Sequence, residues 1–494
     1  MPASPSTARA INDRLALRLL QQEGPLTAGQ LKQLTGLSRP SVADLVERLT
    51  ASGLITVVGE AGEQRRGPNA KLYGIVADRA HLAALDVRTE GVSVFVSDLV
   101  GRVLAEASLP IGGDIGTGPA VEQAVALVER VAKEAGADRL HTVGIGAPGL
   151  IDPSTGELRD SSGLPEWHRR LVAALQERLP EARVSVENET NLAALAEQRD
   201  GAARDRDTFV LLWLGHGTGA AVVLDGALRR GASGGTGEIG FLPVPGTAAL
   251  PSATECEGGF HSLAGSAAIV ELAREHALTT ERTAHEPAAA GVVRQAVALI
   301  SGNGGGPATL PGWSRGSAAA GDGEAGRGGA VAVGDAGARM PGNELGSGGS
   351  AAVGNAETGT RGDEAGKAEP VPAGGAESAA ETCDTGREAP TRDGVGGSDA
   401  RCAARFLDAL ADRLAVGVAS VVAVLDPGCL VLGGEVGRAG GDELAGRVAE
   451  RVRRMSPLPT EVRASALGGG AVLRGALLTA RDRAQDELFA PPAR

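Results

Sequence analysis

Apolar residues recur at helical spacing near the start of the chain. Ile11, Leu15 and Leu19 lie four residues apart, which predicts an amphipathic first helix. Thr27 and Ser38 precede a second and a third apolar series, and their hydroxyls are suited to cap helices that begin there. The side chains expected to face inward from these two helices are Leu31, Leu34, Val42, Leu45, Val46 and Leu49.

A β-hairpin is expected after the third helix. Gly53 should end that helix, and residues 54–58 and 71–75 have the character of strands on either side of a tip that contains Gly and Pro. Residues 1–78 are therefore typical of a winged helix-turn-helix, whose third helix presents its first turn to base edges. The predicted DNA-contacting residues are Ser38, Arg39 and Ser41 on this helix and Arg65 and Arg66 on the wing. The alternative is a three-helix module that binds protein.

From residue 81 onward, short apolar strands alternate with helical stretches, which indicates an α/β fold. Strands are predicted at 82–85, 92–96, 142–145, 183–186, 209–214, 220–224 and 429–432, and helices at 120–135, 192–198, 406–422 and 471–484. Between 285 and 402 Gly and Ala dominate and the periodicity is lost. Such a segment cannot bury enough apolar surface to offset its ordering entropy, so we expect a disordered insertion, which needs no dedicated role.

The charge is distributed unevenly along the chain. The net charge is −13, but residues 1–80 carry +3, which leaves −16 for the rest. This asymmetry suits a small DNA-binding head on a body that repels phosphate. The four cysteines form no CxxC pair, and the chain shows neither a signal segment nor an apolar run of transmembrane length. We therefore expect a cytoplasmic protein that needs no membrane.

Three glycine-bearing or polar turns follow predicted strands, at residues 86–89, 214–219 and 432–434. Such turns bring backbone N–H groups close to phosphates. With the runs Glu187-Asn188-Glu189-Thr190-Asn191 and Gly235-Thr236-Gly237-Glu238-Ile239-Gly240, the order of these motifs resembles the ROK family of repressors, open reading frames and kinases. The resemblance covers essentially all of the chain except the insertion.

The resemblance implies two ribonuclease-H-like (actin-like ATPase) lobes with sugar and ATP in the cleft between them. It places lobe 1 at 79–198, the first part of lobe 2 at 199–284, and the second part with the C-terminal helix at 403–494. A winged helix-turn-helix in front of this body is similar to the xylose-repressor type of regulator in that family.

The sequence departs from the family's kinases at both phosphate and base positions. Their first loop is Asp-x-Gly-Gly-Thr, whereas Asp86 is followed here by Val87-Arg88-Thr89-Glu90. Their catalytic run is Asn-Asp-x-Asn, and Glu189 stands at the position of the base. The longer side chain displaces the carboxylate, and a shift of about 1 Å can cost roughly 100-fold in rate. We therefore expect no catalytic residue, with Glu189 instead capping the following helix or lining the site.

The family's zinc element is also incomplete. Phe241 stands at the histidine position, Cys256 is the single cysteine of the expected cluster, and His261 replaces a sugar-binding glutamate. A tetrahedral site needs four N or S ligands, so we expect no metal and no other cofactor. The polar residues that remain, Asn188, Glu189, Glu238 and His261, imply a sugar or sugar-phosphate effector. The alternative is a relic pocket that binds nothing.

The sequence as a whole favours a transcriptional regulator that binds operator DNA as a homodimer or higher homo-oligomer, and a repressor in particular. Two alternatives remain open at this point. One is an ATP-dependent sugar kinase with an attached DNA-binding head. The other is a DNA-binding protein that responds to no ligand.

Overall fold

The computed structural model of the chain describes residues 5–61, 70–112, 115–159, 165–247, 249–252, 257–279, 286–302 and 392–490. These ranges contain a helical head and two α/β lobes, as the sequence predicted. Within them, none of the helices combines the length and apolar character that crossing a membrane requires.

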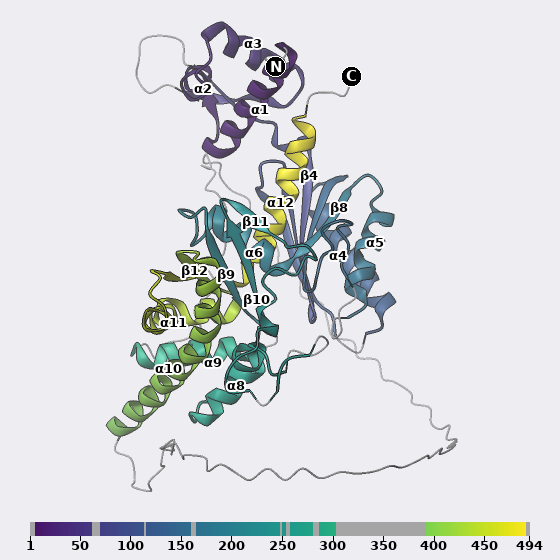
Figure 1. Cartoon of the computed structure of the whole chain (residues 1–494). Helices are drawn as coiled ribbons and strands as arrows, with labels where there is room; N and C mark the ends of the chain where they lie inside the picture. Colours follow the sequence, from purple (N-terminus) through teal and green to yellow (C-terminus); the bar gives the residue numbers. More distant parts are fainter. Residues whose placement is uncertain are drawn as a thin grey trace, which may run out of the picture. The chain divides into compact units, whose positions relative to one another are not determined.

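The head is built from three helices and a three-stranded sheet (Figure 1). Its elements are α1 (Pro5–Glu23), β1 (Leu26–Thr27), α2 (Ala28–Thr35), α3 (Arg39–Ala51), β2 (Ile55–Ala61) and β3 (Ala70–Ile75), with β3 between the other two strands. Thr27 caps α2 in a capping box with Gln30, and Ser38 caps α3, as predicted. Gly36 ends α2 with a φ of 69°, which glycine adopts at little cost.

The buried face of α1 differs from the predicted one. Ala16, Leu17 and Leu20 are buried, whereas Ile11 and Leu15 are exposed. The helix carries two overlapping apolar stripes that both satisfy helical periodicity, and packing against α2, α3 and β3 selects the second. Leu34 of α2 is likewise exposed, while the other five side chains expected to face inward from α2 and α3 are buried.

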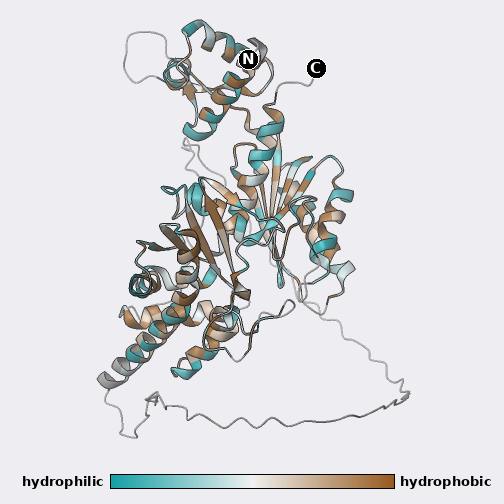
Figure 2. Ribbon diagram, viewed as in Figure 1, coloured by the Kyte–Doolittle hydropathy of each residue, from teal (hydrophilic) through white to brown (hydrophobic). Residues whose placement is uncertain are grey.

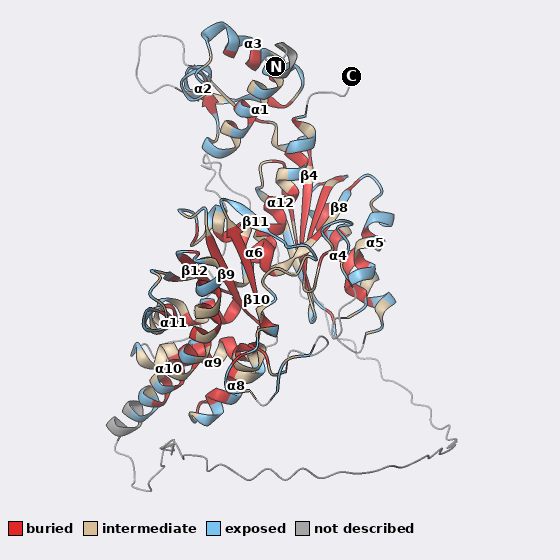
Figure 3. Cartoon of the chain, viewed as in Figure 1, coloured by how far each residue is buried: buried red, intermediate tan, exposed pale blue. Residues whose placement is uncertain are grey.

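Lobe 1 contains a five-stranded sheet in the order β6-β5-β4-β7-β8, and lobe 2 repeats this pattern as β11-β10-β9-β12-β13. In each sheet the central strand pairs with one antiparallel and one parallel neighbour. The three inner strands of each sheet are apolar and largely buried, whereas the edge strands β6, β8, β11 and β13 are more exposed (Figures 2 and 3). Lobe 1 contains η1 (Ala77–Arg79), β4 (His81–Arg88), β5 (Gly91–Asp98), β6 (Val103–Pro110), α4 (Thr117–Glu134), β7 (Leu140–Ala147), α5 (Trp167–Arg178) and β8 (Arg183–Asn188).

Lobe 2 follows through α6 and ends with β13. Its elements are α6 (Glu189–Asp200), β9 (Phe209–Leu214), β10 (Thr218–Leu224), β11 (Ala227–Arg229), η2 (Ile239–Phe241), α7 (His261–Ala264), α8 (Ser266–Glu275), α9 (Ala288–Ile300), α10 (Arg392–Leu425), β12 (Cys429–Gly433), α11 (Gly434–Met455) and β13 (Glu461–Ala464). The chain then passes through η3 (Gly468–Gly470) into the C-terminal helix α12 (Ala471–Leu488).

Helices α6 and α12 connect the two lobes. α12 packs on β4 and β7 of lobe 1, α6 packs on β9 and β10 of lobe 2, and the two helices pack on each other. The sequence had placed residues up to 198 in lobe 1 and the C-terminal helix with lobe 2, whereas α6 contacts strands of both sheets and α12 packs on the sheet of lobe 1. Helical periodicity shows that these segments are helices, but it does not show which sheet each one covers.

The bounds predicted for the insertion, 285–402, are too wide at both ends. Residues 288–300 form α9, whose Val292 and Val293 are buried in the core of lobe 2, and α10 begins at Arg392. Small apolar residues such as Ala289 and Ala290 pack closely there, although their composition resembles that of the Gly/Ala-rich segment that follows. The rest of the expected insertion, residues 303–391, lies outside the described residues.

The assignment of α9 to the core can be tested by placing a charge on each of its faces. Val293→Asp buries an unpaired carboxylate and should cost about 3 kcal/mol or more of unfolding free energy. Gln295→Asp, on the exposed face of the same helix, should change it by about 0.5 kcal/mol or less. Urea unfolding measures both. Equal stability of the two variants would show that α9 is not part of the folded lobe.

Candidate functional site

The first turn of α3 is the part of the predicted DNA surface that the structure describes. Ser38, Arg39 and Ser41 are all exposed there. The Ser38 hydroxyl accepts the Ser41 amide at 3.3 Å, and the two hydroxyl oxygens lie 2.8 Å apart. Ser38 therefore holds the turn in shape, and Arg39 is displayed on it. Arg65 and Arg66 lie outside the described residues.

Arg88, at the end of β4, occupies the first predicted phosphate loop. Its guanidinium pairs with Asp86 at 2.8 Å in its own lobe and with Glu435 at the start of α11 in lobe 2. It also donates to the Gly469 carbonyl at 3.0 Å, immediately before α12. Burial disfavours its charged form, but Asp86 and Glu435 outweigh this effect and raise the pKa of Arg88. We refer to these contacts as the Arg88 clasp.

Asp86 is only partly satisfied by the clasp. The residue is 3% exposed, and burial raises its pKa even though Arg88 opposes the shift. One carboxylate oxygen, Oδ2, receives Arg88 at 2.9 Å. The other, Oδ1, is buried and has no hydrogen-bond partner among the described residues. A buried carboxylate oxygen without a donor is costly, so Oδ1 is suited to accept a hydrogen bond from a ligand.

Two further groups hold the clasp in place. The His168 ring nitrogen Nε2 lies 3.3 Å from the Arg88 carbonyl, and burial lowers the pKa of His168 to about 4. The ring is therefore neutral and can donate to that carbonyl. The fully buried Glu197 of α6 accepts from the Ser465 hydroxyl at 2.5 Å and from the Leu467 amide at 3.0 Å, which fixes the loop before Gly469.

Glu189 is brought next to the clasp. Although part of its surface is accessible, burial and then the negative charge of Asp86 raise the pKa of Glu189 to about 8. Glu435 and Glu238 act on it in the same direction. The side chain is therefore mostly protonated at neutral pH and can donate a hydrogen bond. We call Asp86, Arg88, Glu189, Glu238 and Glu435 the interlobe set.

Asn188 has a structural task. Its side-chain oxygen accepts the Thr190 and Asn191 amides at 2.9 and 3.2 Å, and its nitrogen donates to the Gly149 carbonyl at 2.9 Å. It is thus the cap of α6, the role that the sequence had offered for Glu189. Only the second amide hydrogen of Asn188 therefore remains for the sugar-binding role that the sequence predicted.

Glu238 and His261 lie on the lobe 2 side. Glu238 is an exposed residue, but desolvation by the surrounding protein still raises the pKa of its carboxyl group. The His261 ring lies against Gly265, and burial lowers its pKa. Phe241, at the position of the family's histidine, is 39% exposed. Cys256 lies outside the described residues, within which no group of three or more His, Cys, Asp or Glu side chains is placed to hold a metal ion.

Two further polar side-chain pairs also join the lobes, each with at least one partner at the surface. His216, in the turn between β9 and β10, lies 3.1 Å from Glu90. Arg230, after β11, lies 2.6 Å from Glu187 of β8. Solvent screens both pairs through their exposed partners, so the more buried clasp is the stronger electrostatic link between the lobes.

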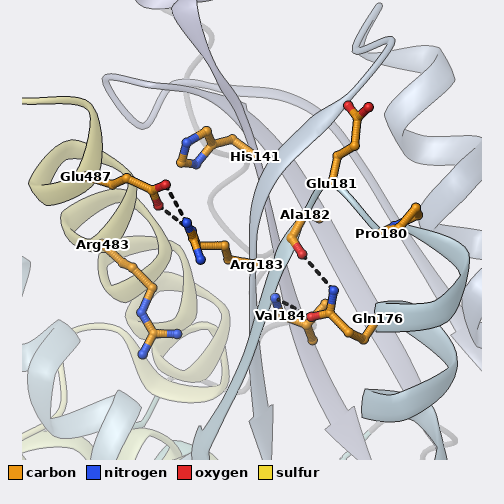
Figure 4. Close-up of a pocket in the computed structure, with 9 residues that line it drawn as sticks. All are labelled: His141, Gln176, Pro180, Glu181, Ala182, Arg183, Val184, Arg483 and Glu487. Atoms are coloured by element: carbon orange, nitrogen blue, oxygen red, sulfur yellow. Dashed lines mark hydrogen bonds and ion pairs between the residues drawn. The ribbon is translucent and has the colours of Figure 1, made fainter. Parts of the chain in front are cut away.

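A cavity of about 640 Å³ lies away from the interlobe set, between β8 and the end of α12 (Figure 4). Arg183 and Glu487 form an ion pair across it, beside His141 and Arg483. An adjoining cavity of about 510 Å³ shares the residues 180–182. Neither contains a residue that the sequence singled out.

Sequence reasoning missed three residues of the site. Glu435 lies 347 positions from Arg88, and Glu197 lies 268 positions from Ser465. His168 stands at the start of α5 without any motif around it. An acid or histidine next to a glycine turn is a sequence signal for a site residue. Of the three, Glu435 carries this signal, because it directly follows Gly433-Gly434.

Comparison with known proteins supports both parts of this architecture. The ROK family model matches residues 83–286, and the MarR family model matches residues 11–67. The DNA-binding transcriptional dual regulator NagC of Escherichia coli (strain K12) is 27% identical over 273 residues, which are 53% of this chain and 64% of NagC. The xylose repressor of Caldicellulosiruptor bescii is 25% identical over 240 residues, 48% of this chain and 59% of that protein. The chain thus spans less than two thirds of the length of these relatives.

Two solved structures share the fold. A ROK family transcriptional regulator described as a homolog of the E. coli MLC protein aligns with a TM-score of 0.59 and 18% identity over 98% of both chains. The ROK hexokinase of Thermus thermophilus aligns with a TM-score of 0.50 and 22% identity, over 82% of this chain and 99% of its own. At this level of identity the likeness establishes the fold alone.

The raised pKa of Glu189 predicts how stability depends on pH. The folded protein keeps this proton up to about pH 8, whereas an unfolded glutamate loses it near pH 4.5. Folded protein therefore binds more protons in this window, and stability should fall as the pH rises through it. Glu189→Gln should flatten that fall in urea unfolding, whereas the exposed Glu157→Gln should keep it. An unchanged pH dependence in Glu189→Gln would contradict the assignment.

Proposed function

Because this chain joins a ROK domain to a MarR-type winged helix-turn-helix domain, we propose that it is a DNA-binding transcriptional repressor whose body senses a carbohydrate. The observation that carries the proposal is the exposed first turn of α3, on which the Ser38 cap displays Arg39. An arginine at this place in a helix-turn-helix can bind a guanine edge with two hydrogen bonds. Such a regulator acts in the cytoplasm, where the DNA is.

The head carries only a small excess of positive charge, so a single head would bind DNA weakly. Two heads on a palindromic operator would add their contacts. We therefore propose a homodimer or higher homo-oligomer as the active form.

The body is proposed not to be a sugar kinase. Arg88 lies in one of the turns that would have to receive nucleotide phosphates, and Glu435 directly follows another. The clasp leaves Arg88 no free charge for phosphates. Glu189, at the position of the base, already carries a proton at neutral pH, so it is a poor acceptor for the proton of a sugar hydroxyl. Both features support a binding site without turnover.

The interlobe set also favours one class of effector. Asp86, Glu189, Glu238 and Glu435 are four acids around one arginine that is already paired with two of them. A phosphorylated sugar would add negative charge to this group, at a cost that grows with burial. The site is therefore proposed to take a neutral or amino sugar in preference to a sugar phosphate.

The DNA-binding part of the proposal is tested with operator DNA selected from random sequence by the full chain. Arg39→Ala should weaken binding by about 1–3 kcal/mol and relax the preference at one or two base pairs. Arg130→Ala, on α4 of lobe 1, is the matched control and should bind like the unchanged protein. If no sequence is enriched, or if Arg39→Ala binds as the control does, the assignment is wrong.

The sensing part is tested by thermal shift with xylose, glucosamine, N-acetylglucosamine and N-acetylglucosamine 6-phosphate at millimolar concentration. A ligand that binds the folded state raises the melting temperature. The unphosphorylated sugars should give the larger shifts, and Glu238→Gln should reduce them. A larger shift with the phosphate ester would reverse the proposed preference, and no shift with any sugar would favour a relic pocket. Sugar phosphate formed in the presence of ATP and magnesium would favour the kinase.

A further inference from the structure

We propose that the Arg88 clasp and α12 form the route by which a ligand at the interlobe set changes the DNA-binding head. The inference rests on the proposed function, since it takes the head to bind DNA and the interlobe set to bind the effector. Four contacts in series carry it.

The first step is at Asp86, which belongs to both the ligand site and the clasp. Oδ2 is held by Arg88, while Oδ1 is buried and unpartnered among the described residues. Asp86 is also close enough to Glu189 for its charge to raise the pKa of that side chain. A ligand hydroxyl that donates to Oδ1 therefore draws negative charge away from Arg88 and weakens the Asp86–Arg88 pair.

The second step leads from Arg88 to the start of α12. Arg88 donates to the Gly469 carbonyl, and Gly470 is the residue before the first turn of that helix. The loop just upstream is fixed by Glu197, whereas the segment 468–470 consists of three glycines. Glycine backbone moves more freely than any other, so this segment is the natural place for the helix to shift relative to the fixed loop.

The third step is α12 itself, whose 18 residues span about 27 Å. It is seated by direct backbone packing at two glycines. Gly475 lies so close to the Leu192 carbonyl that a side chain there would overlap it, and a side chain at Gly144 would come within 2.6 Å of the Ala476 carbonyl. These contacts hold α12 closely against α6 and β7, so a displacement of its first turn would be passed along the helix as a rigid-body shift.

The fourth step is at the end of α12, where it meets the head. The Gln485 side-chain nitrogen donates to the Gln21 side chain of α1 at 2.8 Å and to the Leu99 carbonyl of lobe 1 at 2.9 Å. Arg14 of α1 donates to the Asp486 carbonyl at 3.2 Å. Gln485 is 8% exposed, so its two hydrogen bonds are largely shielded from water, whereas the Arg14 bond is exposed. A shift of α12 would therefore be felt by α1.

Hydrogen exchange on the full chain, without DNA or ligand, tests the route directly. Arg88→Met should raise exchange at least threefold in the amides of α1 and of residues 98–102, which lie at the far end of α12. Glu435→Gln, a milder change that keeps the volume of the side chain, should do the same to a smaller extent. Arg451→Met is the matched control, because Arg451 is also paired with two acids, but these acids, Asp408 and Asp412, lie on α10 and outside the interlobe set.

The outcomes separate this inference from the proposed function. If Arg88→Met and Glu435→Gln raise exchange only near residues 86–90 and 434–437, or if the control raises it equally in α1, the route is wrong even if the protein binds DNA. DNA affinity supplies the second readout. Arg88→Met should change DNA affinity in the otherwise unchanged chain but not in a chain that already carries Gln485→Leu. If the two substitutions change DNA affinity additively, the route is wrong. Failure of every variant and of the unchanged chain to bind DNA would instead refute the proposed function.

Discussion

The arrangement of the body depends on one cation held between two lobes. Arg88 is drawn from a strand end of lobe 1 to an acid of lobe 2, and it is bound by two carboxylates and a carbonyl. A largely buried charge must be paired, and removing one partner costs far more than the pair itself contributes. The lobes are therefore linked without a nucleotide. The same demand explains why Asp86 and Glu435 are buried: they are the counter-charges of Arg88.

The glycines of the phosphate-like turns have reasons to be present that do not involve a nucleotide. Gly434 has a φ of 73°, and a side chain there would overlap the Leu214 carbonyl. Gly237 has a φ of 91° and would overlap the Ala220 carbonyl in the same way. Both turns are thus required by the close approach of backbone segments in lobe 2. Their survival supports the fold but says little about phosphate. In the first loop, side chains stand at Arg88 and Thr89, where the family's kinases have two glycines, and they hinder the close approach of backbone N–H groups to a phosphate.

The sequence predicted those features that depend on neighbours along the chain. The caps at Thr27 and Ser38 were predictable because a cap bonds to amides two or three residues away. The buried face of α1 was not, since Ile11 and Leu17 lie on stripes of equal periodicity and only tertiary contacts select one. The clasp was beyond prediction for a similar reason. Arg88 looked like a defect in a phosphate loop, and the acid that ties it to the other lobe, Glu435, lies 347 positions away in the sequence.

The same site shows how a kinase-like body could serve regulation without catalysis. A ligand shifts an equilibrium between two arrangements only by the difference in its affinity for them. Asp86 could supply such a difference, because its Oδ2 is held by Arg88 while its Oδ1 has no partner among the described residues and can accept from a ligand. Transferring phosphate would require the opposite, an Arg88 with charge to spare and a Glu189 ready to accept a proton. Burial and the surrounding acids work against both. Under the proposed function, the charges that disfavour phosphate transfer are therefore the ones that would make the site responsive to a neutral ligand.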